Sequence, residues 1–167
     1  MLIRQEGRTD YKHIRELNDL AFGSPEESQL IDNLRSQGAA LLSLVAEDQG
    51  DLIGHIFFSR IQIVDGTETT PAVSLAPMCV SSVHQKKGVG GALIHQGLRM
   101  LKHRGEKAVF VLGHKRYYPK FGFSADLAAQ FKSEYSGDSF FALELQPGWM
   151  ENRTGTLVYP EAFSRLS

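Results

Sequence analysis

The sequence predicts a single α/β domain over residues 1–167, with a mixed, mostly antiparallel sheet flanked by helices. The length of 167 residues falls within the usual range of one domain and is enough to bury a core. Hydrophobic residues make up 42% and charged residues 22%, which is typical of a globular protein. Segments with helical spacing and strand-like segments follow one another, without repeats or low-complexity runs.

Two helices are expected near the N-terminus. Residues 9–22 follow a Thr-Asp pair that can cap a helix, and their apolar side chains recur at helical spacing at Ile14, Leu17, Leu20 and Ala21. A second helix is expected from about residue 24 to residue 38. Pro25 stands in its first turn, and Glu26 and Glu27 lie against the positive end of the helix dipole.

A sheet accounts for most of the remaining regular structure. Residues 41–47 and 52–64 flank a polar turn and predict an antiparallel hairpin. A strand over 72–80, a helix over 92–104 that ends at Gly105, and a short apolar strand over 108–112 form a βαβ unit with parallel strands. Two further strands are expected over 140–145 and 155–159.

The turn between residues 80 and 92 carries the most informative motif. Its glycines at 88, 90 and 91 remove Cβ atoms, so successive backbone N–H groups can converge at the positive end of the following helix. Such a turn can hold a phosphate, although it can also be only a tight turn. The turn lacks the Lys-Ser/Thr of a P-loop and the G-x-G-x-x-G of a dinucleotide-binding turn.

Charge is unevenly distributed along the chain. Residues 84–120 hold nine Lys and Arg against one acid, Glu106, which leaves nine basic and 18 acidic residues elsewhere. A basic segment favours a local site for a polyanion, or it is a solvated helix face. A nucleic-acid surface is disfavoured, because the sequence pI of about 6.6 is not that of a basic protein.

Two short motifs stand in order around the expected βαβ unit. Gln85-x-x-Gly88-x-Gly90, between a strand and a helix, matches the Q/R-x-x-G-x-G/A signature of the GCN5-related N-acetyltransferases, the GNAT superfamily. Tyr118, followed by Gly122 and Phe123, resembles its Y-x-x-x-G-F motif. The segment 113–123 looks like a bacterial subgroup of predicted N-acetyltransferases, and the order of elements matches nearly the whole chain. The resemblance implies the acyl-CoA acyltransferase fold with splayed central strands. The stretch between the apolar strand and Tyr118 is short and basic, so the usual fourth helix of the superfamily is expected to be truncated here.

The resemblance implies acetyl-CoA as the co-substrate. The turn amides would take its pyrophosphate, and the freed backbone of the preceding strand would pair with the pantetheine arm and face the thioester carbonyl. The cofactor-binding residues are then expected to be Met78, Cys79, Val80, Gln85, Lys86, Lys87, Gly88, Val89, Gly90 and Gly91.

The resemblance also implies direct transfer to an amine, with Tyr118 as the acid that protonates the departing thiolate. Tyr118 can alternatively be an aromatic core residue, and Cys79 is expected to be a small buried hydrophobe rather than an acyl carrier. His114 can orient a phosphate or lie on the surface. Glu26 or Glu27 can bind a cationic amine or serve the helix dipole.

The sequence therefore favours an N-acetyltransferase that acts on a primary amine of a small molecule or peptide. A non-catalytic acyl-CoA-binding or sensing domain is the alternative. With one cysteine, no metal is expected. No apolar run of about 18 residues and no export signal is found, so a cytoplasmic monomer or homodimer without membrane or nucleic-acid partners is expected.

Overall fold

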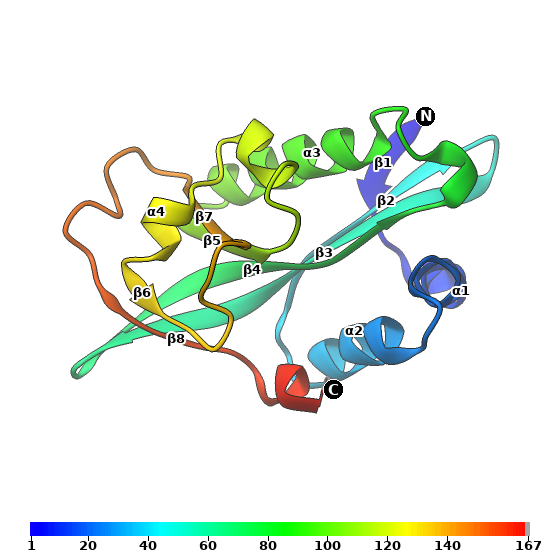
Figure 1. Cartoon of the computed structure of the whole chain (residues 1–167). Coiled ribbons are helices and arrows are strands. Elements are labelled where there is room, and N and C mark those ends of the chain that lie inside the picture. Colours follow the sequence, from blue (N-terminus) through cyan, green and yellow to red (C-terminus); the bar gives the residue numbers. More distant parts are fainter. Residues whose placement is uncertain (166–167) are drawn as a thin grey trace.

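A computed structural model describes residues 1–165 and shows an open sheet with helices on both faces (Figure 1). The strands lie in the order β1-β2-β3-β4-β5-β7, while β8 pairs with β3 and β6 pairs with β8. All pairs are antiparallel except β4–β5 and β6–β8. The strands are β1 Leu2–Gln5, β2 Ala40–Asp48, β3 Asp51–Asp65, β4 Glu68–Val80, β5 Ala108–Leu112, β6 Phe131–Lys132, β7 Phe140–Glu144 and β8 Gly155–Val158.

Helices cover the two faces of the sheet unequally. The structure contains α1 Tyr11–Phe22, α2 Glu26–Ser36, α3 Val89–His103 and α4 Ala125–Ala128, with short 3₁₀ turns η1 Arg8–Asp10, η2 Ser82–His84, η3 Tyr118–Phe121 and η4 Glu161–Arg165. Helix α3 lies on one face, and α1 and α2 lie on the other (Figure 1). The sequence prediction of a mixed, mostly antiparallel α/β fold is confirmed.

The alternation of side chains along β3 separates two cores. Ile56 and Phe58 pack with α3 side chains such as Leu93. Phe57, between them in sequence, packs with Ile31 of α2 on the opposite face. Each helix layer therefore has its own apolar contact with the same strand.

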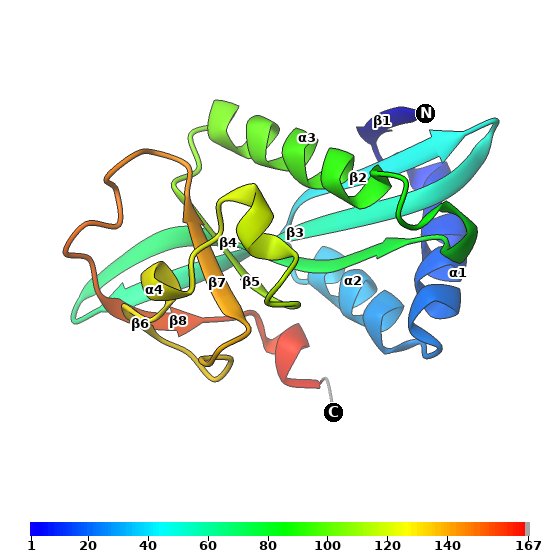
Figure 2. The same ribbon diagram turned by 45° about the horizontal axis from the view of Figure 1, so that its top comes forward.

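Strands β4 and β5 are parallel neighbours, as the βαβ pattern predicts, but they pair only briefly. Their register consists of Val73 with Val109 and Ser74 with Phe110. From Leu75 to Val80, β4 pairs with β3 alone among the described strands. Figure 2 shows β4 and β5 diverging beyond this point. The expected splay of the central strands is therefore present.

Three local expectations are wrong. Leu20, expected on the apolar face of the first helix, is 84% exposed, and Ala21 is exposed as well. The carboxylate of Asp10 does not cap α1; it accepts hydrogen bonds from the Gly7 amide and from Arg4. Helix α3 begins at Val89 rather than at residue 92, so two of the glycines belong to its first turn. Strands β1 and β6 were not expected.

Candidate active site

A cleft of about 1110 Å³ opens beside the unpaired part of β4. It runs past the N-terminus of α3, the segment from Leu112 to Phe121 and the end of α1. Apart from Lys87, every predicted cofactor-binding residue lines it, and so does Tyr118. Lys87 is exposed outside the lining.

The first turn of α3 presents backbone donors to the cleft. The N-cap residue Gly88 adopts the left-handed conformation, at φ 84°, and has no side chain to cap the helix. The amide of Ala92 is bonded to the carbonyl of Gly88, at 3.0 Å. The amides of Val89, Gly90 and Gly91 precede it and are therefore helix-terminal donors without an intrahelical acceptor. This turn is suited to an anion.

Gly90 is required by a close approach. A Cβ atom at this position would lie 2.7 Å from the hydroxyl oxygen of Tyr117 and 3.7 Å from side-chain carbons of Met78 and Val80. Tyr117 and, from η3, Phe121 therefore pack against the start of α3, where a Cβ atom at Gly91 would lie 3.4 Å from the Phe121 ring. Any side chain at residue 90 would force the Tyr117 hydroxyl to move.

Gln85 has a local structural contact in addition to its place in the cleft. Its side-chain amide donates a hydrogen bond to the carbonyl oxygen of Val80, at 3.2 Å. This bond joins the glycine turn to the last residue of β4. The unpaired strand and the helix terminus are thereby held together at one end of the cleft.

Tyr118 has a buried ring and a hydroxyl that opens on the cleft. The residue is 7% exposed, and its ring stacks edge-to-face with Tyr117 and Phe123. A Cβ atom at Gly113 would overlap the ring, so the glycine at the end of β5 makes room for it. The hydroxyl has no hydrogen bond with the described residues and is not among their buried unsatisfied atoms. Burial raises the pKa of Tyr118 to about 12, so the phenol stays protonated at neutral pH.

Cys79 is a buried thiol without an activating base. It is 6% exposed, and burial raises its pKa to about 12, which leaves almost no thiolate. His55 lies directly opposite on β3 and on the same face, an arrangement that could suggest a Cys-His pair. Both of its ring nitrogens, however, are engaged elsewhere: Nδ1 lies 3.3 Å from the Asn18 amide nitrogen and Nε2 lies 2.9 Å from the Ser43 hydroxyl.

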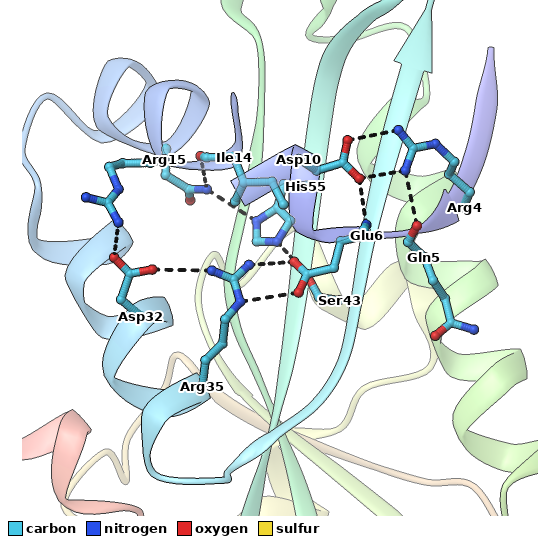
Figure 3. Close-up of polar contacts among 12 residues, drawn as sticks. Arg4, Gln5, Glu6, Asp10, Ile14, Arg15, Asp32, Arg35, Ser43 and His55 are labelled. Atoms are coloured by element: carbon cyan, nitrogen blue, oxygen red, sulfur yellow. Dashed lines mark hydrogen bonds and ion pairs between the residues drawn. The ribbon is translucent and has the colours of Figure 1, made fainter. Parts of the chain in front are cut away.

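His55 belongs to a polar chain beneath the sheet (Figure 3). The Ser43 hydroxyl lies 2.6 Å from Glu6 Oε1, and the Glu6 carboxylate receives two hydrogen bonds from Arg35, at 2.5 and 3.2 Å. The Asn18 amide also donates to the carbonyl of Ile14. His55 Nδ1 must therefore accept and Nε2 must carry the hydrogen. Burial, with a contribution from Arg35, lowers the pKa of His55 to about 3.

The charged residues of the cleft lie at two ends. Lys86 and Lys120 line the part near the glycine turn, together with His84 and His114. Glu27 lines the part near α1 and α2, whereas Glu26 is exposed and does not line the cleft. Most of the basic segment lies elsewhere: Arg104 bonds to Leu41, for example, and Lys115 pairs with Asp138.

Sequence reasoning missed several lining residues. Tyr117, which adjoins Tyr118, lines the cleft and was not among the predicted site residues. Tyr135, Tyr159 and Phe163 also line the cleft and come from the last third of the chain. No motif marks these three residues, because they come from separate segments that meet only in the folded protein.

Within residues 1–165, no group of three or more His, Cys, Asp or Glu side chains is placed to hold a metal ion. No helix of this described part has both the length and the apolar character needed to cross a membrane.

The fold and cleft define a GNAT acetyltransferase, and comparison with known proteins agrees. The model of the acetyltransferase (GNAT) domain matches residues 3–125. The uncharacterized N-acetyltransferase YhbS of Escherichia coli K12 is 32% identical over 169 aligned residues, covering 99% of this chain and all of YhbS. YjhQ from the same organism, also an uncharacterized N-acetyltransferase, is 39% identical over 118 residues, 70% of this chain and 65% of YjhQ. The chain therefore belongs to the GNAT acetyltransferase family.

Solved structures support the same assignment. The crystal structure of Escherichia coli YhbS in complex with CoA superposes with a TM-score of 0.91 at 31% identity, over 99% of this chain and 93% of that chain. A GNAT family acetyltransferase from Brucella melitensis in complex with acetyl-CoA gives a TM-score of 0.81 at 33% identity, over 97% of each chain. By class, the protein is an acyltransferase.

Proposed function

We propose that the protein transfers an acetyl group from acetyl-CoA directly to a primary amine. One observation carries the proposal: the unpaired edge of β4 and the uncapped start of α3 meet in one cleft, in a chain whose relatives were crystallised with CoA and acetyl-CoA. An anion site and an extended slot side by side are what a molecule with phosphates at one end and a long arm requires.

Each end of the cleft has a distinct part in binding. The amides of Val89, Gly90 and Gly91 donate hydrogen bonds to the pyrophosphate, and Lys86 and Lys120 attract the phosphates. The backbone of Met78, Cys79 and Val80 pairs with the pantetheine arm as an added strand would. The arm then ends in the gap between β4 and β5, close to the segment that holds Tyr118.

Bound acetyl-CoA supplies an activated acyl carbon and a thiolate leaving group. Tyr118 donates its hydroxyl proton toward the sulfur as the C–S bond breaks. Because a phenol with a pKa of about 12 is protonated at neutral pH, it hydrogen-bonds the developing thiolate before its proton passes to the sulfur. Cys79 contributes its backbone and not its thiol, because it has neither a base nor a thiolate population.

The test combines binding with turnover. Calorimetry should show acetyl-CoA binding by the wild-type protein. Gly90→Val should weaken it at least about tenfold, because the valine side chain collides with the Tyr117 hydroxyl and crowds the first turn of α3, where the anion is proposed to bind. Gln96→Val, on the same helix but away from the cleft, controls for the lower helix propensity of valine. Thiol release from acetyl-CoA in the presence of an amine panel then measures transfer.

Two results would contradict the proposal. Unchanged affinity in a folded Gly90→Val variant would remove the anion site from the first turn of α3. Tight acetyl-CoA binding with no thiol release for any amine would instead indicate a binding or sensing domain.

A further inference from the structure

The end of the cleft away from the glycine turn has an aromatic wall. Tyr135 and Tyr159 stack edge-to-face with ring centroids 4.9 Å apart, and Tyr159 and Phe163 do so at 5.1 Å. All three line the cleft. They come from three places, namely the segment between β6 and β7, the residue after β8, and η4. The ring contacts fix this wall before any ligand binds, and such a surface favours a flat apolar group.

Helices α1 and α2 provide the opposing apolar residues. Phe22, the last residue of α1, lines the cleft and is 41% exposed, and Leu30 of α2 lies beside the cleft as well. When an apolar ligand covers a solvent-exposed phenyl ring on a cleft wall, the free energy of the complex is lowered. No sequence pattern predicts an exposed phenylalanine at residue 22, and binding of an apolar ligand would account for it.

The two ends of the cleft belong to opposite faces of the sheet. Phe163 packs in the core under α2, whereas the first turn of α3 packs in the core on the other face. Figure 1 shows α3 on one side of the sheet and α2 with η4 on the other. The gap beyond Ser74, where β5 no longer pairs with β4, connects them. A second substrate can therefore approach from the α2 side while the first occupies the α3 side.

Glu27 supplies the charge at this second end. It stands in the first turn of α2, is half-buried, and has no hydrogen bond or ion pair with the described residues. The other charged residues that line the described cleft, Lys86 and Lys120, are cations on the α3 side. The helix dipole would stabilise Glu26 equally well, so the dipole alone does not explain why Glu27 faces the cleft.

We infer that the acceptor is a primary amine attached to a flat aromatic or apolar body, with no carboxylate beside the amine. This inference rests on the proposed acetyl transfer and names its substrate class. The rings of the wall and Phe22 hold the body, and the Glu27 carboxylate binds the ammonium group. A free amino acid is disfavoured, because none of the described lining residues from α1, α2, β8 or η4 is a cation that could pair with its carboxylate.

Glu27 and Tyr118 also account for the proton transfers that the acetylation reaction requires. The ammonium group gives one proton to Glu27, which passes it to solvent, and the neutral nitrogen forms a bond to the thioester carbonyl carbon. The C–S bond breaks with its electron pair on sulfur, which takes the Tyr118 proton. The amide nitrogen loses its extra proton to solvent, and Tyr118 recovers one from solvent. The products are the N-acetylated amine, the free thiol of CoA and one released proton.

The experiment measures ligand binding to the protein saturated with CoA, so it does not depend on turnover. Four probes separate the contributions of the ring, the amine charge and a carboxylate. 2-Phenylethylamine carries a ring and a charged amine, and 2-phenylethanol carries the ring without the amine. Butylamine carries the charged amine on a small body, and phenylalanine adds a carboxylate to the ring and the amine. We expect 2-phenylethylamine to bind at least about tenfold more tightly than each of the others, since one charged hydrogen bond or one buried ring contributes that much.

Matched variants locate the effect. Glu27→Gln should weaken 2-phenylethylamine at least about tenfold and leave 2-phenylethanol unchanged, whereas Glu26→Gln should change neither. Phe22→Ala should weaken both ring-containing probes, and because Phe22 is partly exposed, the variant should fold. Acetyl-CoA affinity, measured separately, should be the same in all variants.

The outcomes distinguish this inference from the proposed function. If acetyl-CoA binds and polyamines or lysine peptides are acetylated in preference to 2-phenylethylamine, the substrate class is wrong and acetyl transfer stands. If 2-phenylethylamine does not bind to the CoA-loaded protein, or binds Glu27→Gln equally well, the site is wrong. If acetyl-CoA does not bind, the proposed function fails first.

Discussion

Two adjacent tyrosines, Tyr117 and Tyr118, line the cleft. The hydroxyl of Tyr117 lies over Gly90 at the anion end, and that of Tyr118 opens on the cleft from a ring packed against Gly113. Tyr117 immediately precedes η3 and Tyr118 begins it, and their rings meet edge-to-face with centroids 5.2 Å apart. A substitution in either can therefore affect a different step.

The first prediction concerns Tyr118→Phe, which keeps the ring and removes only the hydroxyl. We expect kcat to fall by about 10²-fold with little change in acetyl-CoA affinity or Tm, because a positioned proton donor contributes at least this much. With a pKa of about 12, the wild-type phenol should stay active as a donor at high pH, so kcat should show no tyrosine-dependent decrease near pH 10.

Tyr117→Phe is the comparison. It should weaken acetyl-CoA binding more than it changes kcat, because its hydroxyl lies at the helix amides. Measuring kcat, affinity and Tm on the same preparations distinguishes catalysis from packing. An unchanged kcat in Tyr118→Phe would make Tyr118 a core aromatic residue only.

The second prediction concerns Cys79→Ala. Turnover should be largely retained, because direct transfer uses the backbone of this residue and its thiol has no base. Loss of a buried sulfur atom should lower the free energy of unfolding by about 1 kcal/mol. Intact-mass analysis after mixing with acetyl-CoA checks the mechanism: an acetyl adduct on the wild type that is absent from the variant would replace direct transfer with a covalent route.

At the scale of elements, the polar chain from His55 to Arg35 joins the sheet to the helices of its α1/α2 face. Asn18 belongs to α1, Arg35 to α2, and Ser43 and His55 to adjacent strands. A protonated His55 would set Nδ1–H against the Asn18 amide donor, which is unfavourable in addition to burial. The polar chain therefore favours the packing of α1 and α2 on this face while His55 is neutral.

The third prediction follows from the depressed pKa of His55. The unfolded chain binds a proton there below about pH 6.5, whereas the folded protein binds it only near pH 3. The contribution of neutral His55 is complete above pH 6.5 and is lost as pH falls from 6.5 toward 3, by up to about 1.4 kcal/mol per pH unit.

Denaturant unfolding at several pH values checks this slope. His55→Gln removes the titrating group, so its free energy of unfolding should fall less steeply than that of the wild type between pH 6.5 and pH 5. Parallel curves for the two proteins would show that His55 does not carry this pH dependence.

The elements predicted from sequence are those with strong local patterns. The hairpin and α3 follow from period and glycine signals, and the parallel pairing of β4 with β5 follows from the βαβ order. Strand β1 was missed because Leu2–Gln5 is only four residues long and pairs with a distant strand, β2. Leu20 was misplaced because periodicity alone does not locate the buried face of α1, whose buried residues are Ile14, Leu17 and Asn18.

In the cleft, too, the residues that were predicted are those that belong to a local sequence pattern. The glycine turn and Tyr118 carry recognisable motifs, so the sequence predicts where an anion and a proton donor should lie. Lys86 and Lys87 are adjacent in sequence, and only folding separates the one that lines the cleft from the one that does not. The aromatic wall joins residues from separate segments, so no local pattern encodes it.

Over the whole molecule, a net charge of −1 conceals a cleft whose cations lie at one end. Our fourth prediction is that CoA affinity falls as salt concentration rises, and that Lys86→Gln reduces both the affinity and this salt dependence more than Lys87→Gln does. Titrations at several ionic strengths measure both effects.

Dephospho-CoA should bind less tightly than CoA if a cation meets the 3′-phosphate. Duplex DNA should not compete with CoA at physiological salt.

The short pairing between β4 and β5 also places a strand edge inside the sheet. Within the described part of the chain, backbone groups of β4 from Leu75 to Val80 have no strand partner on one side, and such edges can template pairing with another molecule. A ligand lying along the strand would cover this edge. Bound CoA should therefore reduce aggregation, measured as less light scattering on heating. It should also slow amide exchange at residues 78–80. At a hundredfold excess over Kd, CoA should stabilise the folded protein by about 2.7 kcal/mol.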